Sequence, residues 1–67
     1  MKITLNNREV TFDKNELTIN ELLELSNFSY KLLIVKVNGK LARKEAYDST
    51  IVKDGDDVTV LHLVTGG

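Results

Sequence analysis

Apolar and polar residues alternate over residues 3–5 and again over residues 10–12, as they do in strands with one buried face. Asn6 and Asn7 separate the two runs, and asparagine tolerates the positive φ angles that a two-residue hairpin turn requires. The pattern therefore predicts an antiparallel hairpin, followed by a polar connector over residues 13–16.

Beyond the connector, the apolar residues take the spacing of an amphipathic helix. Thr18 and Glu21 fit a capping box, in which the threonine hydroxyl accepts from the third helical N–H and the glutamate accepts from the cap N–H. Ile19, Leu22 and Leu23 then share one face, and the glutamates of this segment point outward. We expect a short helix that lies on a sheet.

The stretch over residues 32–37 is the most β-branched of the chain and is the best candidate for a central strand. Because Lys36 interrupts the apolar run, we expect Val35 and Val37 to face the helix. An Asn-Gly pair follows, which is a strong turn signal, and residues 40–42 then predict a short edge strand.

The rest of the chain leads into a final strand. Residues 43–50 show no clear period and predict a loop with one helical turn, whereas the Asp-Gly-Asp sequence at 54–56 predicts a tight turn. A last strand should cover residues 57–64. Together these elements predict an α+β fold of the β-grasp type, in which a mixed sheet of four to five strands carries one main helix on one face.

The last predicted strand does not alternate cleanly, because Val58 and Val60 lie on one face and Leu61 and Leu63 lie on the other. A strand covered on one side only should alternate. Either a bulge near Leu61 shifts the register and everything is buried, or the strand leaves an apolar stripe uncovered for a partner, and a bulge and a stripe can also occur together. On the second interpretation, the candidate partner-binding residues are Leu61, His62, Leu63, Val64 and Thr65.

The composition is that of one small globular domain. With 67 residues, 42% hydrophobic and 28% charged, the chain has room for a single domain with a modest core. A net charge of −1 gives no electrostatic basis for binding nucleic acid or an anionic membrane. The absence of cysteine excludes a disulfide framework and a thiolate nucleophile. We expect one domain over residues 1–67, cytoplasmic and monomeric on its own, with no signal peptide and no membrane-spanning segment.

Two glycines end the chain, Gly66 and Gly67. Since glycine makes up about 7% of average sequence, such a pair arises by chance in roughly one chain in two hundred. Bare backbone can enter a cleft too narrow for any side chain, and a terminal carboxylate can be activated as an acyl adenylate and then attacked by sulfur or nitrogen. The alternative is a frayed terminus or the remnant of a fusion tag. On the first interpretation, residues 65–67 form a flexible tail with its reactive group on Gly67.

Three other clusters are weaker candidate sites. His62 has no serine or cysteine nucleophile paired with it in any motif, and it has no companion metal ligands. The aspartates at 54, 56 and 57 are interpreted as turn formers, because Thr65 stands where a calcium loop of the EF-hand type requires glutamate. The basic residues at 40, 43 and 44 are interpreted as a solvated loop, with contact to an acidic groove as the alternative. We therefore expect no metal site.

Short motifs follow one another along nearly the whole chain and end at its last residue. They are Met-Lys-Ile-Thr-Leu-Asn at 1–6, Thr-Ile-Asn-Glu-Leu-Leu at 18–23, Val-Asn-Gly at 37–39, Arg-Lys-Glu-Ala-Tyr at 43–47, Asp-Gly-Asp at 54–56 and the closing Gly-Gly. In this order they resemble the ThiS family of sulfur-carrier proteins of thiamine biosynthesis, which have the ubiquitin-like β-grasp fold. One departure is Ala42, where the family usually has proline before the arginine.

The resemblance implies a protein substrate rather than an enzyme. An E1-like adenylyltransferase of the ThiF type would adenylate the Gly67 carboxylate with ATP, and a persulfide sulfur would displace AMP to leave a thiocarboxylate. A thiazole synthase of the ThiG type would then receive the sulfur. ATP and the persulfide would be used by these partner enzymes, with no cofactor bound by this chain, since it has no glycine-rich phosphate loop.

Three alternatives remain open at this point. The small subunit of molybdopterin synthase uses the same Gly-Gly thiocarboxylate, although the chain length and the Asp-Gly-Asp-x-Val ending favour the thiamine family. The second alternative is a ubiquitin-like modifier that is conjugated to lysine. The third is a non-covalent binding module, which is disfavoured because the sequence lacks the basic and aromatic surface that such modules use for nucleic acid.

Overall fold

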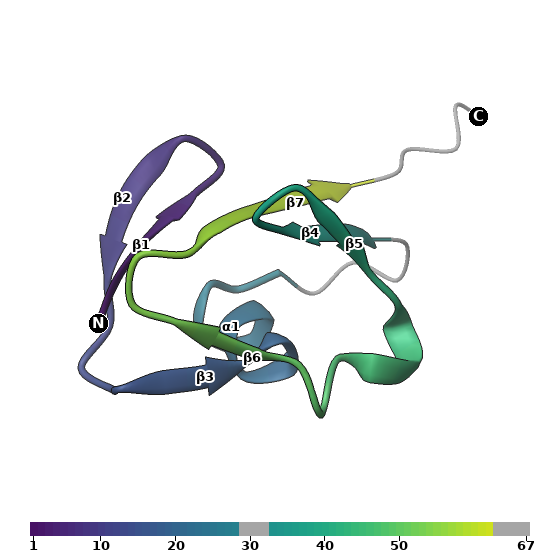
Figure 1. The fold of residues 1–67 in the computed structure, drawn as a ribbon, viewed down its shortest axis with the longest axis horizontal. Helices are drawn as coiled ribbons and strands as arrows, with labels where there is room; N and C mark the ends of the chain where they lie inside the picture. Colours follow the sequence, from purple (N-terminus) through teal and green to yellow (C-terminus); the bar gives the residue numbers. More distant parts are fainter. Residues whose placement is uncertain (29–32, 63–67) are drawn as a thin grey trace.

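The computed structural model describes residues 1–28 and 33–62. Within these residues the chain forms short strands, one α-helix and a single 3-10 turn at Lys44–Ala46 (Figure 1). The order is the α+β succession expected from the sequence. The other elements are β1 (Lys2–Leu5), β2 (Arg8–Thr11), β3 (Glu16–Thr18), α1 (Ile19–Leu25), β4 (Leu33–Val37), β5 (Lys40–Ala42), β6 (Ile51–Lys53) and β7 (Asp57–His62).

Five of the strands form one mixed sheet in the order β2-β1-β7-β4-β5. β7 runs parallel to β1 and antiparallel to β4, and the remaining neighbours are antiparallel. The strand predicted over residues 32–37 is found as β4, with residue 32 outside the described residues. β4 is paired on both sides, but the middle strand of the sheet is β7, because only the short β5 lies beyond β4.

A second sheet, which the sequence pattern did not predict, pairs β3 with β6. Each of these strands has three residues, too few for a period-two pattern to stand out, and Glu16 belongs to β3 rather than to the predicted connector. Leu17 and Val52 lie opposite each other in this pair and are only 1% and 0% exposed. The small sheet therefore contributes its inner face to the same core as the large one.

The predicted hairpin turns have the backbone angles that their residues favour. Asn6 and Asn7, between β1 and β2, have φ angles of 51° and 66°. Asn38 and Gly39, between β4 and β5, have φ angles of 52° and 82°. Positive φ at both central residues gives the turn whose twist matches that of the flanking strands. Both hairpins are therefore confirmed, together with the predicted edge strand β5.

The helix begins with the predicted capping box. The Thr18 hydroxyl accepts from the Glu21 N–H at 3.1 Å, and the Glu21 carboxylate accepts from the Thr18 N–H at 2.9 Å. The hydrogen bond from the Thr18 backbone is the main cause that lowers the pKa of Glu21 below its ordinary value of 4.5. Because the folded state favours the ionised form, this carboxylate stabilises the fold above pH 4.5 and loses that contribution as the pH falls through its lowered pKa.

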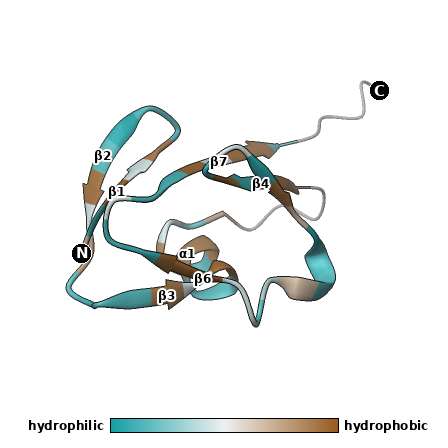
Figure 2. Ribbon diagram, viewed as in Figure 1, coloured by the Kyte–Doolittle hydropathy of each residue, from teal (hydrophilic) through white to brown (hydrophobic). Residues whose placement is uncertain are grey.

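One hydrophobic core joins the helix to both sheets, and Figure 2 shows apolar residues in α1, β6, β7 and β4. α1 buries Ile19, Leu22 and Leu23 as expected, and Val35 is fully buried while Val37 is half-buried against the core. No helix within the described residues is long and apolar enough to cross a membrane. The buried core residues are Ile3, Leu5, Leu17, Ile19, Leu22, Leu23, Val35, Tyr47, Val52, Val58 and Val60.

The segment predicted as a loop with one helical turn contributes Tyr47 to this core. Tyr47 directly follows the 3-10 turn and is 6% exposed. Burial raises the pKa of its hydroxyl above the ordinary value of 10.0, and the nearby Glu45 carboxylate raises it further. The segment is therefore part of the packed structure, although it has no repeating pattern in the sequence.

Replacing Thr18 with alanine should lower the free energy of unfolding by about 1 kcal/mol, because the Glu21 N–H loses its acceptor. Urea unfolding followed by circular dichroism measures this loss. Thr11→Ala is the matched control, since Thr11 is an exposed threonine of the edge strand β2 with no side-chain hydrogen bond among the described residues. Equal losses in the two variants would show that the cap contributes nothing.

Candidate functional site

β7 carries two of the candidate partner-binding residues, Leu61 and His62, and its register is regular. Its pairing with β4 runs without interruption over residues 58–62. The bulge considered near Leu61 is therefore wrong, and Leu61 lies on the opposite face of the sheet from the buried Val60. Leu61 is 47% exposed and Val60 is 4% exposed. The structure therefore agrees with the second interpretation of this strand, in which an apolar residue is left uncovered.

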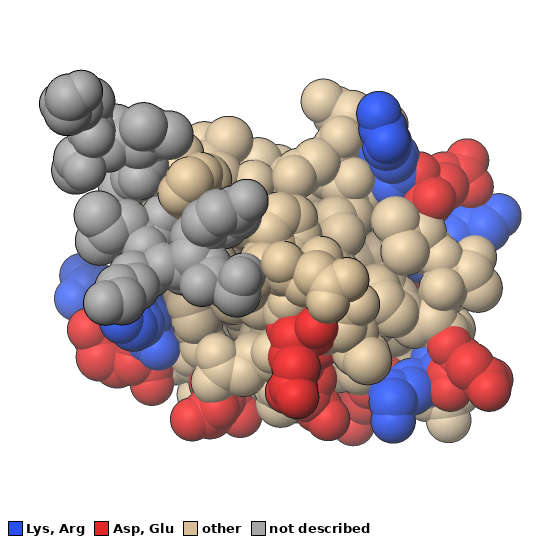
Figure 3. All heavy atoms as spheres, turned by 180° about the vertical axis from the view of Figure 1, so that it is seen from behind, with Lys and Arg blue, Asp and Glu red and all other residues tan. Residues whose placement is uncertain are grey.

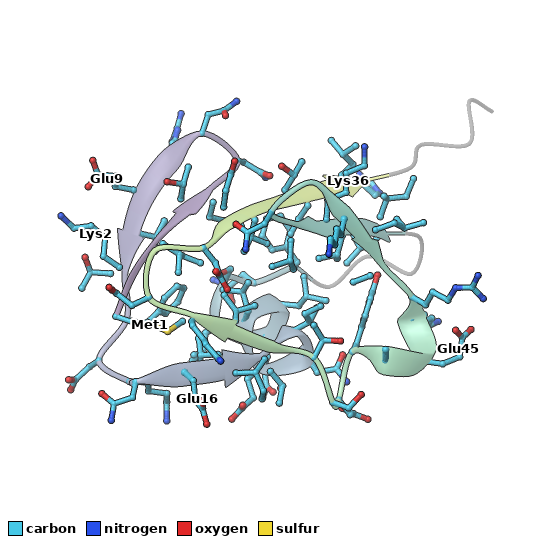
Figure 4. All side chains as sticks on the ribbon, in the orientation of Figure 1. Met1, Lys2, Glu9, Glu16, Lys36 and Glu45 are labelled. Carbon is cyan, nitrogen blue, oxygen red and sulfur yellow. The ribbon has the colours of Figure 1, made fainter. Side chains whose placement is uncertain are left out.

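The outer face of the large sheet carries an apolar patch at the end of β7. Leu61 lies opposite Ile34, and Lys36 lies opposite Leu41 on the next strand. Leu41 is 64% exposed, and Ile34 is half-buried. Lys36 belongs to the same face and points away from α1 (Figure 4). We call Ile34, Leu41 and Leu61 the outer patch. Of the three residues, only Leu61 is a candidate from the sequence alone, because strand pairing is what places Ile34 beside it and Leu41 diagonally beside Ile34 on the next strand.

Asn6 holds β7 at the point where β1 ends. β1 pairs with β7 only as far as Leu5 opposite Val58. Beyond that pair, the side-chain amide of Asn6 donates to the Val60 C=O at 3.1 Å and its oxygen accepts from the Val60 N–H at 2.7 Å. The side chain thus satisfies both backbone groups of Val60 on this side of the strand. The sequence predicts Asn6 only as a turn residue, since no local signal reveals a contact 54 residues away.

The described part of the chain ends with β7, beside the outer patch. His62, the last residue of the strand, is exposed and lies opposite Leu33. The remaining candidate site residues lie outside the described residues, and they are Leu63, Val64, Thr65, Gly66 and Gly67. The flexibility expected for residues 65–67 therefore stays a prediction.

The aspartates of the predicted turn act within the fold. The Asp54 carboxylate accepts from the Lys2 N–H at 2.6 Å. The Asp56 carboxylate accepts from the Asn38 side-chain amide at 3.0 Å and from the Lys53 N–H at 2.9 Å. These contacts confirm that both residues form the turn before β7. Across residues 1–28 and 33–62, no three side chains of His, Cys, Asp or Glu are grouped so that they could hold a metal ion.

Charged side chains of both signs are mixed on one face of the molecule. Figure 3 shows that, on the face seen from behind, Lys and Arg side chains lie among Asp and Glu side chains around the rim. Lys2 and Glu9, on neighbouring strands, form an ion pair at 3.2 Å (Figure 4). The face of Figure 3 therefore offers no extended basic surface of the kind that binds nucleic acid.

A mixed five-stranded sheet that packs against one helix places the protein in the class of ubiquitin-like β-grasp proteins. The model of the ThiS family matches residues 2–67. The chain therefore belongs to the ThiS family, the sulfur carriers of thiamine biosynthesis. Membership implies that it acts with enzymes of that pathway, as a carrier and not as a catalyst.

Individual relatives support this assignment over the full chain. The sulfur carrier protein ThiS of Bacillus subtilis (strain 168) is 32% identical over 65 residues, which cover 97% of this chain and 98% of that protein. The crystal structure of ThiS from Geobacter metallireducens superposes with a TM-score of 0.90 at 36% identity and covers 100% of both chains. A solution structure of a thiamine biosynthesis protein from the same organism gives 0.77 at 37% identity, covering 100% of this chain and 88% of that one. The ubiquitin-like β-grasp fold expected from the sequence is thus confirmed.

Asn6→Gly should destabilise the protein by about 1–3 kcal/mol, because glycine keeps the positive φ of the turn but loses both hydrogen bonds to Val60. Asn7→Gly is the matched control, since it makes the same change in the same turn and leaves the Asn6 side chain in place. Chemical unfolding gives the two free energies, and amide hydrogen exchange at Val60 reports the lost contact directly. A loss shared equally by both variants would assign the effect to the turn rather than to the hydrogen bonds with β7.

Proposed function

We propose that the carboxylate of Gly67 is the group that carries the sulfur. A carboxylate resists nucleophiles until one of its oxygens becomes part of a good leaving group. Attack of a Gly67 oxygen on the α-phosphorus of ATP gives an acyl adenylate and releases pyrophosphate. A persulfide then attacks the carbonyl carbon and expels AMP, and a thiol cleaves the resulting acyl disulfide to leave a thiocarboxylate. ATP, the persulfide and the thiol all belong to partner enzymes.

The observation that carries this proposal is the outer patch, an apolar surface of the sheet in which Leu61 lies one residue before the end of β7. Leu41 and Leu61 expose apolar area to water, and covering such area is favourable. A partner that covers Leu61 is thereby placed next to the point where β7 ends. We assign this docking role to an E1-like adenylyltransferase of the ThiF type. His62 would lie at the rim of the contact, and Leu63, Val64 and Thr65 would lead Gly66 and Gly67 into the partner's active site.

A thiazole synthase of the ThiG type would take up the thiocarboxylate in the second half of the cycle. Because neither glycine has a side chain, the same tail fits a narrow channel in each partner. The carrier has to leave the first enzyme before it meets the second, so each docking contact has to be reversible. A small patch suits this, since modest interfaces belong mainly to transient complexes. We place the cycle in the cytoplasm, with the carrier monomeric between partners and binding no cofactor of its own.

Deleting Gly66 and Gly67 should abolish sulfur loading and leave the stability of the fold unchanged, because among residues 1–28 and 33–62 every buried core residue lies at or before Val60. The measurement is the accurate mass of the tail fragment after incubation with ATP, an E1-like adenylyltransferase and a sulfur source. The fragment has to exclude Met1, since methionine oxidation nearly matches a sulfur-for-oxygen exchange in nominal mass. A full-length tail that stays a plain carboxylate, or that becomes linked to lysine, would contradict the proposal.

Leu61→Ala should weaken binding to the adenylyltransferase by about 1–2 kcal/mol, the loss typical of an apolar residue that a partner covers. Leu25→Ala is the control, because Leu25 is 53% exposed on α1 and lies outside the outer patch. Isothermal titration calorimetry with each variant gives the affinities. If Leu25→Ala weakens binding as much as Leu61→Ala, the partner docks on the helix side and the role of the outer patch is refuted.

A further inference from the structure

A groove of about 690 Å³ lies between β5 and β6; it shares Leu41 with the outer patch, and its other lining residues lie outside that patch. Its walls come from the edge of the large sheet, from the 3-10 turn and from the small sheet. Figure 1 shows β5 and β6 on either side of this region, joined through the 3-10 turn. The groove therefore lies where the two sheets meet without pairing to each other.

The first wall is an unpaired strand edge. β5 is the last strand on its side of the sheet. In a hairpin with a two-residue turn, the pair next to the turn exchanges both hydrogen bonds, whereas the following pair exchanges none. Lys40 opposite Val37 is the first of these pairs, and Leu41 opposite Lys36 is the second. The N–H and C=O of Leu41 consequently point away from β4, toward the open edge, where another strand could pair with them.

The charge of the lining favours an acidic ligand. Lys40, Arg43 and Lys53 line the groove, and within the described residues none of the three takes part in an ion pair. Asp56 is the acidic residue of the lining, and its two carboxylate oxygens already accept from Asn38 and from the backbone of Lys53. The balance of the lining is therefore positive, and its basic side chains are available to incoming carboxylates.

The remaining lining is apolar and partly small. Ala42 and Ala46 leave room for an incoming side chain, and Ile51 is 37% exposed. An apolar side chain of a bound segment could therefore be covered here while its neighbours reach the basic residues. Successive side chains of an extended strand point to alternate sides, so an aliphatic residue flanked by acidic ones matches this arrangement.

We propose that this groove binds an extended acidic segment of a partner protein, which adds as a strand to the free edge of β5. The Leu41 backbone supplies the pairing, and Lys40, Arg43 and Lys53 select for acidic residues. Main-chain pairing with side-chain selection is an established way of recognising extended peptides. The contact would add a docking surface that adjoins the outer patch at Leu41. It does not depend on the chemistry of Gly67.

The probe is a fluorescein-labelled peptide with the sequence Glu-Asp-Val-Glu-Asp, blocked at both ends. Binding to the full chain is followed by fluorescence anisotropy, and the site is located from amide shifts in the NMR spectrum. We expect shifts at Leu41, Arg43 and Lys53, and weaker binding as salt is raised. Shifts centred on Leu61, or equal affinity for a peptide with lysine in place of each acidic residue, would overturn the proposal.

Two pairs of variants separate the parts of the site. Leu41→Pro removes the outward N–H, a change that an edge strand tolerates. Leu41→Ala keeps the N–H and removes the same side chain, so Leu41→Pro should bind about five- to tenfold more weakly than Leu41→Ala.

The second pair tests the charge of the groove. Lys40→Glu with Arg43→Glu should weaken binding at least about tenfold. The same double reversal at Arg8 and Lys14, which lie outside the groove, should leave the affinity nearly unchanged. Circular dichroism verifies that each variant is folded.

If the two double reversals weaken peptide binding equally, the weakening comes from the overall charge of the protein and not from the groove. If Leu41→Pro and Leu41→Ala bind the peptide equally well, the peptide does not pair with β5. Either result refutes the proposal as stated. The variant without Gly66 and Gly67 should bind the peptide as the full chain does. Peptide binding and sulfur loading are therefore tested separately, and the failure of one leaves the other result intact.

Discussion

The hydrogen-bonded register of β7 is the constraint on which the rest of the structure depends. β7 pairs with β1 on one side and β4 on the other. A slip of one residue would turn Val58 and Val60 out of the core and bring Leu61 into it, because side chains alternate between the faces of a strand. Continuous pairing with β4 opposes that slip, and the Asn6 side chain at Val60 opposes it beyond the end of β1. The buried core and the outer patch are thus two consequences of one register.

The small size of the domain explains why so many short elements share one core. α1 has only seven residues, and a helix of that length is marginal without packing and caps. The capping box orders its first turn, and Ile19, Leu22 and Leu23 bury its apolar face. The small sheet adds Leu17 and Val52 to the same core. Each short element is stable because the others cover it, as expected when a small chain has no cysteine and so no disulfide to hold it together.

The proposed function assigns chemistry and recognition to different parts of the chain. The reactive group would be the carboxylate of Gly67, whereas recognition would come from the exposed Leu61 and its neighbours on the sheet. A carrier visits more than one enzyme, so surfaces that are independent of the reactive group let each partner recognise the same protein. The proposed groove along β5 would be such a surface, since its pairing edge and basic lining lie apart from the end of β7.

The sequence by itself determined the features that depend on neighbouring residues. The asparagine turns, the capping box at Thr18, the strand at β4 and the Asp-Gly-Asp turn follow from local backbone preference and local hydrogen bonds. The order of motifs also identified the ThiS family. The tertiary structure decided what depends on distant contacts: the pairing of β3 with β6, the outward position of Leu61, its meeting with Ile34, and the hold of Asn6 on Val60. These contacts join residues far apart in the chain, and no local pattern carries that information.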